Sequence, residues 1–515
     1  MLKQLAGQTA IYGVGTIVPR FLNYLLFPYL TRLMTTGEYG VVTDLYALIP
    51  FALVVLTMGL ETGYFRFAGQ AATERERKEV FETTWGAVSL FALLFFAAAL
   101  LFTPALARIM DYAEHPSYIR LTAAIIALDA ATAIPFARLR QQGRAKRFVA
   151  LRLLSVAVNL ALTVFFYSAL PALASRGADA GMYDPAFGAG YVLVANLLGS
   201  AVVWIGLYPS CRGARPRIRP KLLRAVMLYS LPLLISGIAG TANEFIDRQM
   251  IKYLLPPESS MDALGIYGAV AKLGVVLMLF TQMYRYAAEP YFLSAFRQED
   301  FRRSNAEALK YFIIVSVGIF LTIMLFVDLF GLLMGRDFRQ GIRVLPIILL
   351  ANMFSGIWMN LSFWYKQSGQ TQYAIWITGT GLVFTVGLNL ALPPALGYPG
   401  AALARLGCET GHGRRQLLSE PEALPDALRP ASDRIVLSGG RRDLRPVAAD
   451  GPSEPCGALR RQPAVARSLR VACRTPRADR PKRVASLDRQ ALDCETALSE
   501  KRNAILVTNI NRTVR

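Results

Sequence analysis

The chain has 515 residues, of which 54% are hydrophobic and only 18% charged, and its mean hydropathy is +0.36. So apolar a composition excludes a soluble enzyme of this length and is typical of a polytopic membrane protein. The formal net charge of +21 then indicates membrane topology and contact with anionic lipid, and we expect no nucleic-acid partner. The five cysteines form no CxxC pair, so we expect no disulfide framework, metal site or cofactor.

Apolar runs of about 20 residues recur along the chain, and each is long enough to cross about 30 Å of hydrocarbon. They predict spans at 9–30, 41–60, 82–104, 119–138, 150–170, 189–208, 226–247, 263–283, 309–334, 343–363 and 371–393, with a twelfth that begins near Gly397. We therefore expect an all-α polytopic membrane protein.

The first span is unusually polar for a membrane anchor. It carries Pro19, Arg20, Asn23 and Pro28 within an apolar run. Polar groups in hydrocarbon are costly unless they are buried in protein or face water. Arg20 and Asn23 are three residues apart and share one helix face between the two prolines. This pattern predicts a bent helix that lines a polar cleft; a local structural hydrogen bond is the alternative.

The connections between spans alternate in charge. Those after the even-numbered spans are basic, whereas those after the odd-numbered spans hold far fewer basic residues. The positive-inside rule for short loops then places the N-terminus in the cytoplasm. The basic residues of three of these connections are Arg75, Arg77 and Lys78; Arg144, Lys146 and Arg147; and Arg212, Arg215, Arg217, Arg219, Lys221 and Arg224.

An internal repeat relates the two parts of the chain. The stretch from Tyr12 to Val41 finds an echo from Tyr229 to Ala269, with Thr31-Arg32 aligned to Asp247-Arg248. The offset of about 220 residues corresponds to six spans, so the two halves share one orientation. We expect two six-helix bundles around a central cleft: an N-terminal half at 1–210, a basic cytoplasmic linker at 211–225 and a C-terminal half at 226–407.

From Cys408 the composition changes to Arg, Pro, Ala and Ser, without a run long enough to span a membrane. One interpretation of 408–515 is a disordered cytoplasmic tail. The other is a reading frame lost near 407–411, which leaves the last helices incomplete. We favour the lost frame, because the break falls inside an apparent helix just after Gly400–Leu406.

No phosphate-binding loop, HExxH or GxSxG motif is present, so we predict that the protein is not an enzyme. Ionisable residues within spans are the remaining signal. Lys272 lies about ten residues into its span and is hard to explain without a polar lumen. Glu244 and Arg248 have the spacing of a helical ion pair, whereas Asp129 is solitary. Glu61 and Arg66 close the second span, and a solvated helix end explains them equally well.

Five motifs together resemble one family. They are the first helix from Tyr12 to Arg32, the sequence GEYGV at 37–41, LTMGLETGYFRF at 56–67, and NEFIDRQM at 243–250 followed by LGIYG at 264–268. Residues 1–406 thus resemble the polysaccharide-biosynthesis, oligosaccharide-lipid flippases of the multidrug/oligosaccharidyl-lipid/polysaccharide exporter superfamily. Members usually continue with a full twelfth span, where this chain has its Arg-rich segment.

The resemblance implies a bacterial inner-membrane flippase that moves a polyprenyl-diphosphate-linked oligosaccharide by alternating access. Because the sequence lacks a nucleotide site, we expect transport to draw on a proton or sodium gradient or on the onward consumption of its product. From the polar residues within and beside the spans, we take Arg20, Asn23, Arg66 and Lys272 as candidates for the substrate. The candidates for the coupling ion are Glu61, Asp129, Glu244 and Asp247, and those for structure or gating are Pro19, Pro28, Arg32 and Arg248. The alternatives are a cation-coupled multidrug antiporter of the same superfamily and a membrane glycosyltransferase or polymerase.

Overall fold

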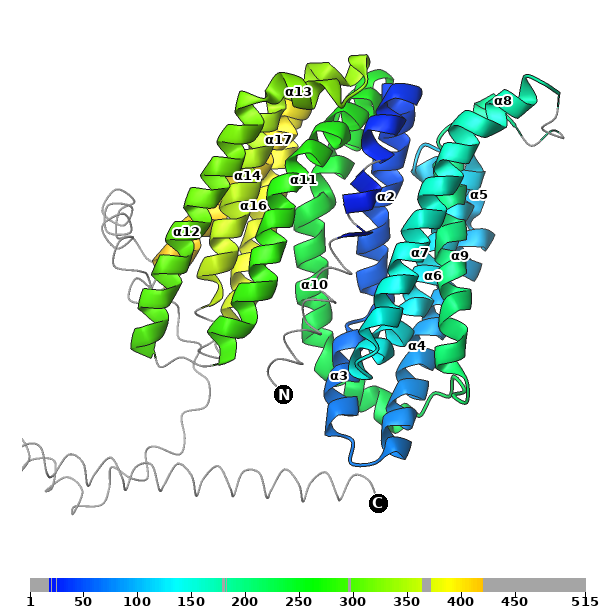
Figure 1. Cartoon of the computed structure of the whole chain (residues 1–515), viewed down its shortest axis with the longest axis vertical. Helices are drawn as coiled ribbons and strands as arrows, with labels where there is room; N and C mark the ends of the chain where they lie inside the picture. The colour runs from blue at the N-terminus through cyan, green and yellow to red at the C-terminus, as the bar shows by residue number, and fades with distance from the viewer. Residues whose placement is uncertain are drawn as a thin grey trace, which may run out of the picture. The chain divides into compact units, whose positions relative to one another are not determined.

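The structure is a computed structural model that describes residues 18–19, 21–24, 26–177, 181, 183–294, 298–363 and 372–419 (Figure 1). All of these belong to one compact unit, Met1–Gly439. The secondary structure of the described residues is helical, without a strand. Ten of their helices are long and apolar enough to cross a membrane, which confirms a multi-pass, all-α protein.

The N-terminal half begins with a helix over residues 18–33, in which positions 20 and 25 are not described. The remaining elements are α2 (Thr36–Thr57), α3 (Leu60–Gln70), α4 (Glu74–Leu101), α5 (Thr103–Ile109), α6 (Pro116–Gln141), α7 (Ala145–Val164) with the π-turn η1 (Phe165–Ala169), α8 (Leu170–Ala174), η2 (Pro185–Phe187) and α9 (Gly190–Cys211).

The C-terminal half comprises α10 (Pro220–Leu254), α11 (Pro257–Ser294), α12 (Gln298–Leu325), α13 (Val327–Leu332), η3 (Arg336–Val344), α14 (Leu345–Leu361), α16 (Gln372–Leu396) and α17 (Tyr398–Ser419). Helix α17 runs through the predicted break near 407 and continues to Ser419. It packs against α14 and α16 and carries the buried Cys408 into the core of this half.

Successive spans run in opposite directions, so the connections gather at two ends. We call the end that holds the connections 70–74, 141–145 and 211–220 the basic end, because Arg and Lys residues lie in or directly beside each of them. The opposite end, where α2 and α11 begin, is the far end and lies at the top of Figure 1. Large apolar side chains such as Leu93, Ile205 and Leu325 are exposed on the outer helices, as expected of surfaces that face lipid.

Helix α2 forms the main contact between the halves, against α10 and α11. A capping box of Thr35 and Glu38 fixes its start at the far end. There, a Cβ on Gly40 would lie 2.1 Å from the carbonyl oxygen of Met261, and one on Gly265 would lie 1.9 Å from that of Thr36. Only glycine permits this backbone approach, which closes the far end in the same way that small residues join helices in membranes.

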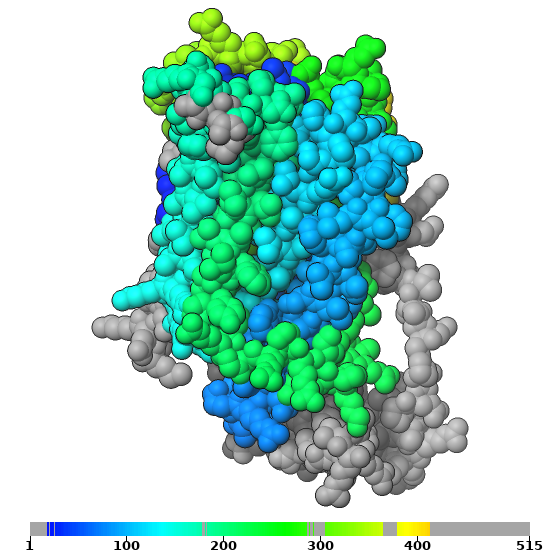
Figure 2. Space-filling model, turned by 90° about the vertical axis from the view of Figure 1, so that its right-hand side faces the viewer, coloured from blue at the N-terminus to red at the C-terminus, as the bar shows by residue number. Residues whose placement is uncertain are grey.

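At the basic end, the segment 212–219 lies against α4. The amide N–H of Arg215 donates to Glu82 Oε1 at 3.1 Å, and Arg219 forms an ion pair with Glu82 at 3.4 Å. The hydroxyl of Thr83 donates to the carbonyl of Arg217 at 3.3 Å. Figure 2 shows this face, with α9 and the segment after it in green beside α4 in blue. The link between the halves is thus fixed to the N-terminal half.

Candidate functional site

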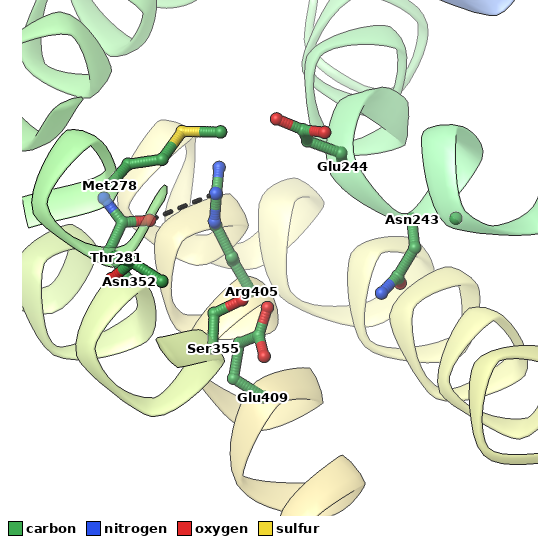
Figure 3. Close-up of a pocket in the computed structure, with 9 residues that line it drawn as sticks. Asn243, Glu244, Met278, Thr281, Asn352, Ser355, Arg405 and Glu409 are labelled. Atoms are coloured by element: carbon green, nitrogen blue, oxygen red, sulfur yellow. Dashed lines mark hydrogen bonds between the residues drawn. The ribbon is translucent and has the colours of Figure 1, made fainter. Parts of the chain in front are cut away.

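A polar cavity of about 210 Å³ lies in the C-terminal half, between α10, α11, α14 and α17 (Figure 3). Helices with mostly apolar sequences surround it, so its polar lining is exceptional for its surroundings. Ionisable and amide side chains from different helices converge there. The lining residues are Gly240, Asn243, Glu244, Met278, Thr281, Asn352, Ser355, Arg405 and Glu409.

Arg405 of α17 is the cation of this cavity. Its Nη2 donates to Asn352 Oδ1 at 3.2 Å, and Asn352 Nδ2 in turn donates to the carbonyl of Gly274 at 2.9 Å. Its Nη1 lies 3.8 Å from Asp247 Oδ2. These contacts join α17 to α14, α11 and α10 and hold the guanidinium at the cavity wall (Figure 3).

Asp247 is shared by two arginines and a phenol. Arg248 Nη1 approaches Asp247 Oδ1 at 2.9 Å, while the Tyr267 hydroxyl donates to Oδ2. The predicted ion pair between Glu244 and Arg248 is therefore wrong. Arg248 donates a hydrogen bond to the backbone carbonyl of Glu244, and its ion pair is with Asp247. The Asp247 carboxylate is adjacent to Arg248 in the chain and therefore closer to its guanidinium. The Asp247 side chain is only 4% exposed, so without Arg248 this buried charge would face Arg405 alone.

The Glu244 carboxylate is thereby left to face the cavity. Glu409 of α17 lies on another wall, where it forms a hydrogen bond with Ser355. Figure 3 shows the side chains of Glu244, Arg405 and Glu409 around the same space. Two carboxylates, one guanidinium and the amides of Asn243 and Asn352 can exchange protons or hold a small cation.

The predicted substrate residues do not all meet at this cavity. Lys272 is exposed on α11, close enough to Arg248 for the two cations to repel each other. Asn23 is exposed on the first helix, and Arg20 lies outside the described residues. Arg66 is at the basic end, with its guanidinium 4.2 Å above the ring of Tyr229, so it joins α3 to α10.

Two of the predicted ion-coupling residues lie in the N-terminal half, away from the cavity. Glu61 forms an ion pair with Arg140 across α3 and α6. Asp129 of α6 accepts a hydrogen bond from Ser200 Oγ of α9 at 2.7 Å. The geometry of both is that of a structural partner within this half.

The predicted gating residues also have definite positions. Pro19 is buried and Pro28 is partly buried in the first helix. Arg32, at the end of that helix, donates from Nη2 to the carbonyl of Leu332 at 2.9 Å. It therefore joins the two halves at the far end.

Sequence reasoning missed Arg405, Glu409 and Lys252. Arg405 and Glu409 lie where the composition of the sequence changes, and Lys252 follows a predicted span, where a lysine is expected to lie in a solvated loop. Lys252 is buried and pairs with Asp44 at 2.6 Å. The structure explains the miss, because α10 continues as a helix to Leu254 and places Gln249 and Lys252, three residues apart, on one face.

A family model described as polysaccharide biosynthesis protein matches residues 5–296. A search of the curated proteins found no match. Among solved structures, the fold is shared by the lipid II flippase MurJ in an inward closed conformation, with TM-score 0.63, 12% identity and coverage of 80% of this chain and 87% of that chain. The fold is also shared by a multidrug resistance MATE family transporter of the MOP superfamily in an inward-facing conformation. The TM-score is 0.62 at 15% identity, and the match covers 83% of this chain and 99% of that chain.

The outward-facing conformation of such a MATE transporter gives a TM-score of 0.55 at 15% identity, with coverage of 84% and 96%. The family match and the shared fold together support a membrane flippase or exporter. Since the family model covers more than half of the chain, the protein belongs to the polysaccharide biosynthesis protein family.

Proposed function

We propose that the protein moves a polyprenyl-diphosphate-linked oligosaccharide across the bacterial inner membrane by alternating access between its two halves. The observation that carries the proposal is the set of ionisable groups within the C-terminal half, around the cavity and at Lys272. Charges at this depth are costly in hydrocarbon, so they favour a path for a polar cargo over a purely structural bundle.

The cargo has chemistry that suits such a path. Its diphosphate is anionic and its glycan is polar, whereas its prenyl chain can stay in the bilayer. Lys272 is exposed and shares its neighbourhood with Arg248, so a polyanion placed there relieves the repulsion between the two cations. In this proposal Lys272 and Arg20 hold the diphosphate, with Asn23 beside them.

The closed far end fits one state of the cycle. Gly40 and Gly265 close it by backbone contact. If the basic end faces the cytoplasm, as the positive-inside rule predicts, the protein is in the state that loads cargo from the cytoplasm. The higher TM-score with the inward-facing than with the outward-facing MATE conformation supports this assignment.

The cavity supplies the coupling step of the proposal. Opening and closing need a source of free energy, and the sequence holds no nucleotide-binding motif. Glu244 and Glu409 face the same space beside Arg405. A proton or a sodium ion that binds there reduces the negative charge that surrounds the Arg405 guanidinium. We assign the coupling ion to this cavity.

The test is export in cells and in vesicles. Arg20→Ala and Lys272→Ala should abolish glycan export at normal membrane abundance in a strain that lacks its own flippase. Purified protein in vesicles should move a lipid-linked oligosaccharide, and each variant should lower the rate by at least tenfold. Arg75→Ala is the matched control, because Arg75 has an 89% exposed side chain at the basic end. Full export by both cleft variants contradicts the proposal.

A cation-coupled multidrug antiporter is the second proposal. The acidic residues Glu244 and Glu409 at the cavity favour it, because the substrates of such antiporters are cationic. Efflux of a fluorescent organic cation from loaded vesicles, without movement of lipid-linked oligosaccharide, would decide for the antiporter. The opposite pattern would decide for the flippase.

A further inference from the structure

An ion pair with almost no solvent exposure joins the two halves near the far end. Lys252 Nζ of α10 lies 2.6 Å from Asp44 Oδ2 of α2, and their side chains are 1% and 0% exposed. Burial this complete is unusual for a Lys and an Asp, since each loses its hydration. The partners come from different halves, so any movement that separates α2 from α10 must break the pair.

The surrounding groups complete the bonding of both charges. Asp44 Oδ2 accepts the Tyr112 hydroxyl at 2.6 Å, and Oδ1 accepts Gln249 Nε2 at 2.6 Å. Lys252 Nζ also donates to the carbonyl of Met110 at 2.8 Å and lies 4.3 Å above the Tyr112 ring. Burial and the Asp44 carboxylate raise the pKa of the Tyr112 phenol, which keeps it protonated as a donor.

Helix α10 presents a different face to each half. Asp247 bonds Tyr267 of α11 and Arg405 of α17, which ties α10 to the C-terminal half. Gln249 and Lys252 bond Asp44 of α2, and Lys252 also bonds Met110 beyond α5. Three other interhalf contacts at this end are hydrogen bonds. Those from Arg32 to Leu332 and from Thr36 to Asp262 are exposed, whereas the N–H of Gly335 donates to the buried Thr31 hydroxyl at 3.2 Å. The Asp44–Lys252 pair is therefore placed to report, and to control, the separation of the halves.

We propose that Asp44 and Lys252 are positioning residues of the transport cycle, whose ion pair forms when the far end closes and breaks when it opens. The inference rests on the proposed alternating access. An ion pair suits this task because water rehydrates both charges on opening, which offsets the attraction lost. Apolar side chains at the same positions would keep the closed state and resist opening, since opening would expose them to water.

The test measures closure of the far end without any cargo. Cysteines replace Thr36 and Asp262, whose side chains bond across the halves, in a background in which the five native cysteines are serine. The rate of oxidative cross-linking between them in vesicles reports the closed state. Asp44→Asn, Lys252→Met and the double variant Asp44→Leu/Lys252→Met are then compared with the parent. The control is Glu74→Gln/Arg77→Gln, an exposed pair within α4.

We expect the single variants and the double variant to act in opposite directions. Each single variant leaves one charge buried without its counterion, so the far end opens and the cross-linking rate falls at least tenfold. The double variant should cross-link at the parent rate or faster and still export at least tenfold more slowly. The control should change neither readout by more than twofold.

Two results would overturn the inference. One is an unchanged cross-linking rate in both single variants at normal membrane abundance. The other is a double variant that closes and exports like the parent, because the pair would then only fill space. A failure of the proposed function looks different: the parent itself moves no lipid-linked oligosaccharide, while the cross-linking comparison still gives its answer.

Discussion

The two halves contain similar numbers of helices but use their polar residues differently. In the N-terminal half, Glu61 has Arg140 and Asp129 has Ser200, so each acid has a partner on a neighbouring helix. In the C-terminal half, Asp247 forms ion pairs with both Arg248 and Arg405, and the Glu244 carboxylate faces a cavity together with Glu409. Among the acids predicted to couple ions, those of the N-terminal half thus bond to neighbouring helices, whereas Glu244 lines a cavity.

The two kinds of environment differ in what a bound cation can add. A carboxylate that is paired with a guanidinium, as Glu61 is with Arg140, gains little from a proton or a sodium ion, because its charge is already compensated. A carboxylate at a cavity has room for either. In the proposed cycle, we therefore expect the cavity of the C-terminal half to bind the coupling ion.

The largest expected effect is at Asp247. Asp247→Ala leaves Arg248 and Arg405 without their shared carboxylate, which should destabilise the protein by about 3–5 kcal/mol. The loss of folded protein on heating in detergent, followed by size-exclusion chromatography, measures this. Asp129→Ala in the other half is the comparison and should cost about 1–3 kcal/mol, because it removes a hydrogen bond and no ion pair. Equal losses would erase the contrast between the halves.

An intermediate effect is expected on coupling. Glu244→Gln and Glu409→Gln should each lower the rate of gradient-driven export at least tenfold, because the cavity loses an ionisable carboxylate. A tenfold lower rate corresponds to an activation free energy that is higher by about 1.4 kcal/mol. Asp129→Asn should keep its dependence on the gradient. Vesicle transport with and without proton and sodium gradients separates the cases. Gradient dependence lost only in Asp129→Asn would move the coupling site to the N-terminal half.

The smallest effect is expected at Glu61. Its side chain is 39% exposed and that of Arg140 is 35% exposed, so water screens the pair. Glu61→Gln should change stability by no more than about 1 kcal/mol and leave export near the parent value. A large loss of export from this variant at normal abundance would give the N-terminal half a functional acid.

The sequence predicted the spans well, because hydropathy and alternating basic connections are properties of single segments. It predicted the polar site less well, because the cavity arises from packing. Glu244 was identified, but its predicted bond to Arg248 gave way to Asp247, which is adjacent in the chain and buried. Arg405 and Glu409 reach the site only because α17 continues past the point near 407 where the composition of the sequence changes.

Lys252 shows the same limit at a helix end. A cation just after an apolar run is usually solvated, and only the path of α10 beside α2 buries this one. The roles of Arg20 and Asn23 stay predictions, since the first is outside the described residues and the second contacts nothing that fixes its role. Motifs thus located the helices, and tertiary structure decided which charges met.

The attachment of segment 212–219 to α4 bears on how the protein is made. Glu82 and Arg219 are 137 residues apart, so the ribosome delivers five further helices before the arginine that pairs with this carboxylate. Glu82 then waits at the membrane surface until synthesis passes residue 219. The contact that closes the first six spans can thus form only after the last of those spans has been synthesised, and both of its partners precede α10 in the chain.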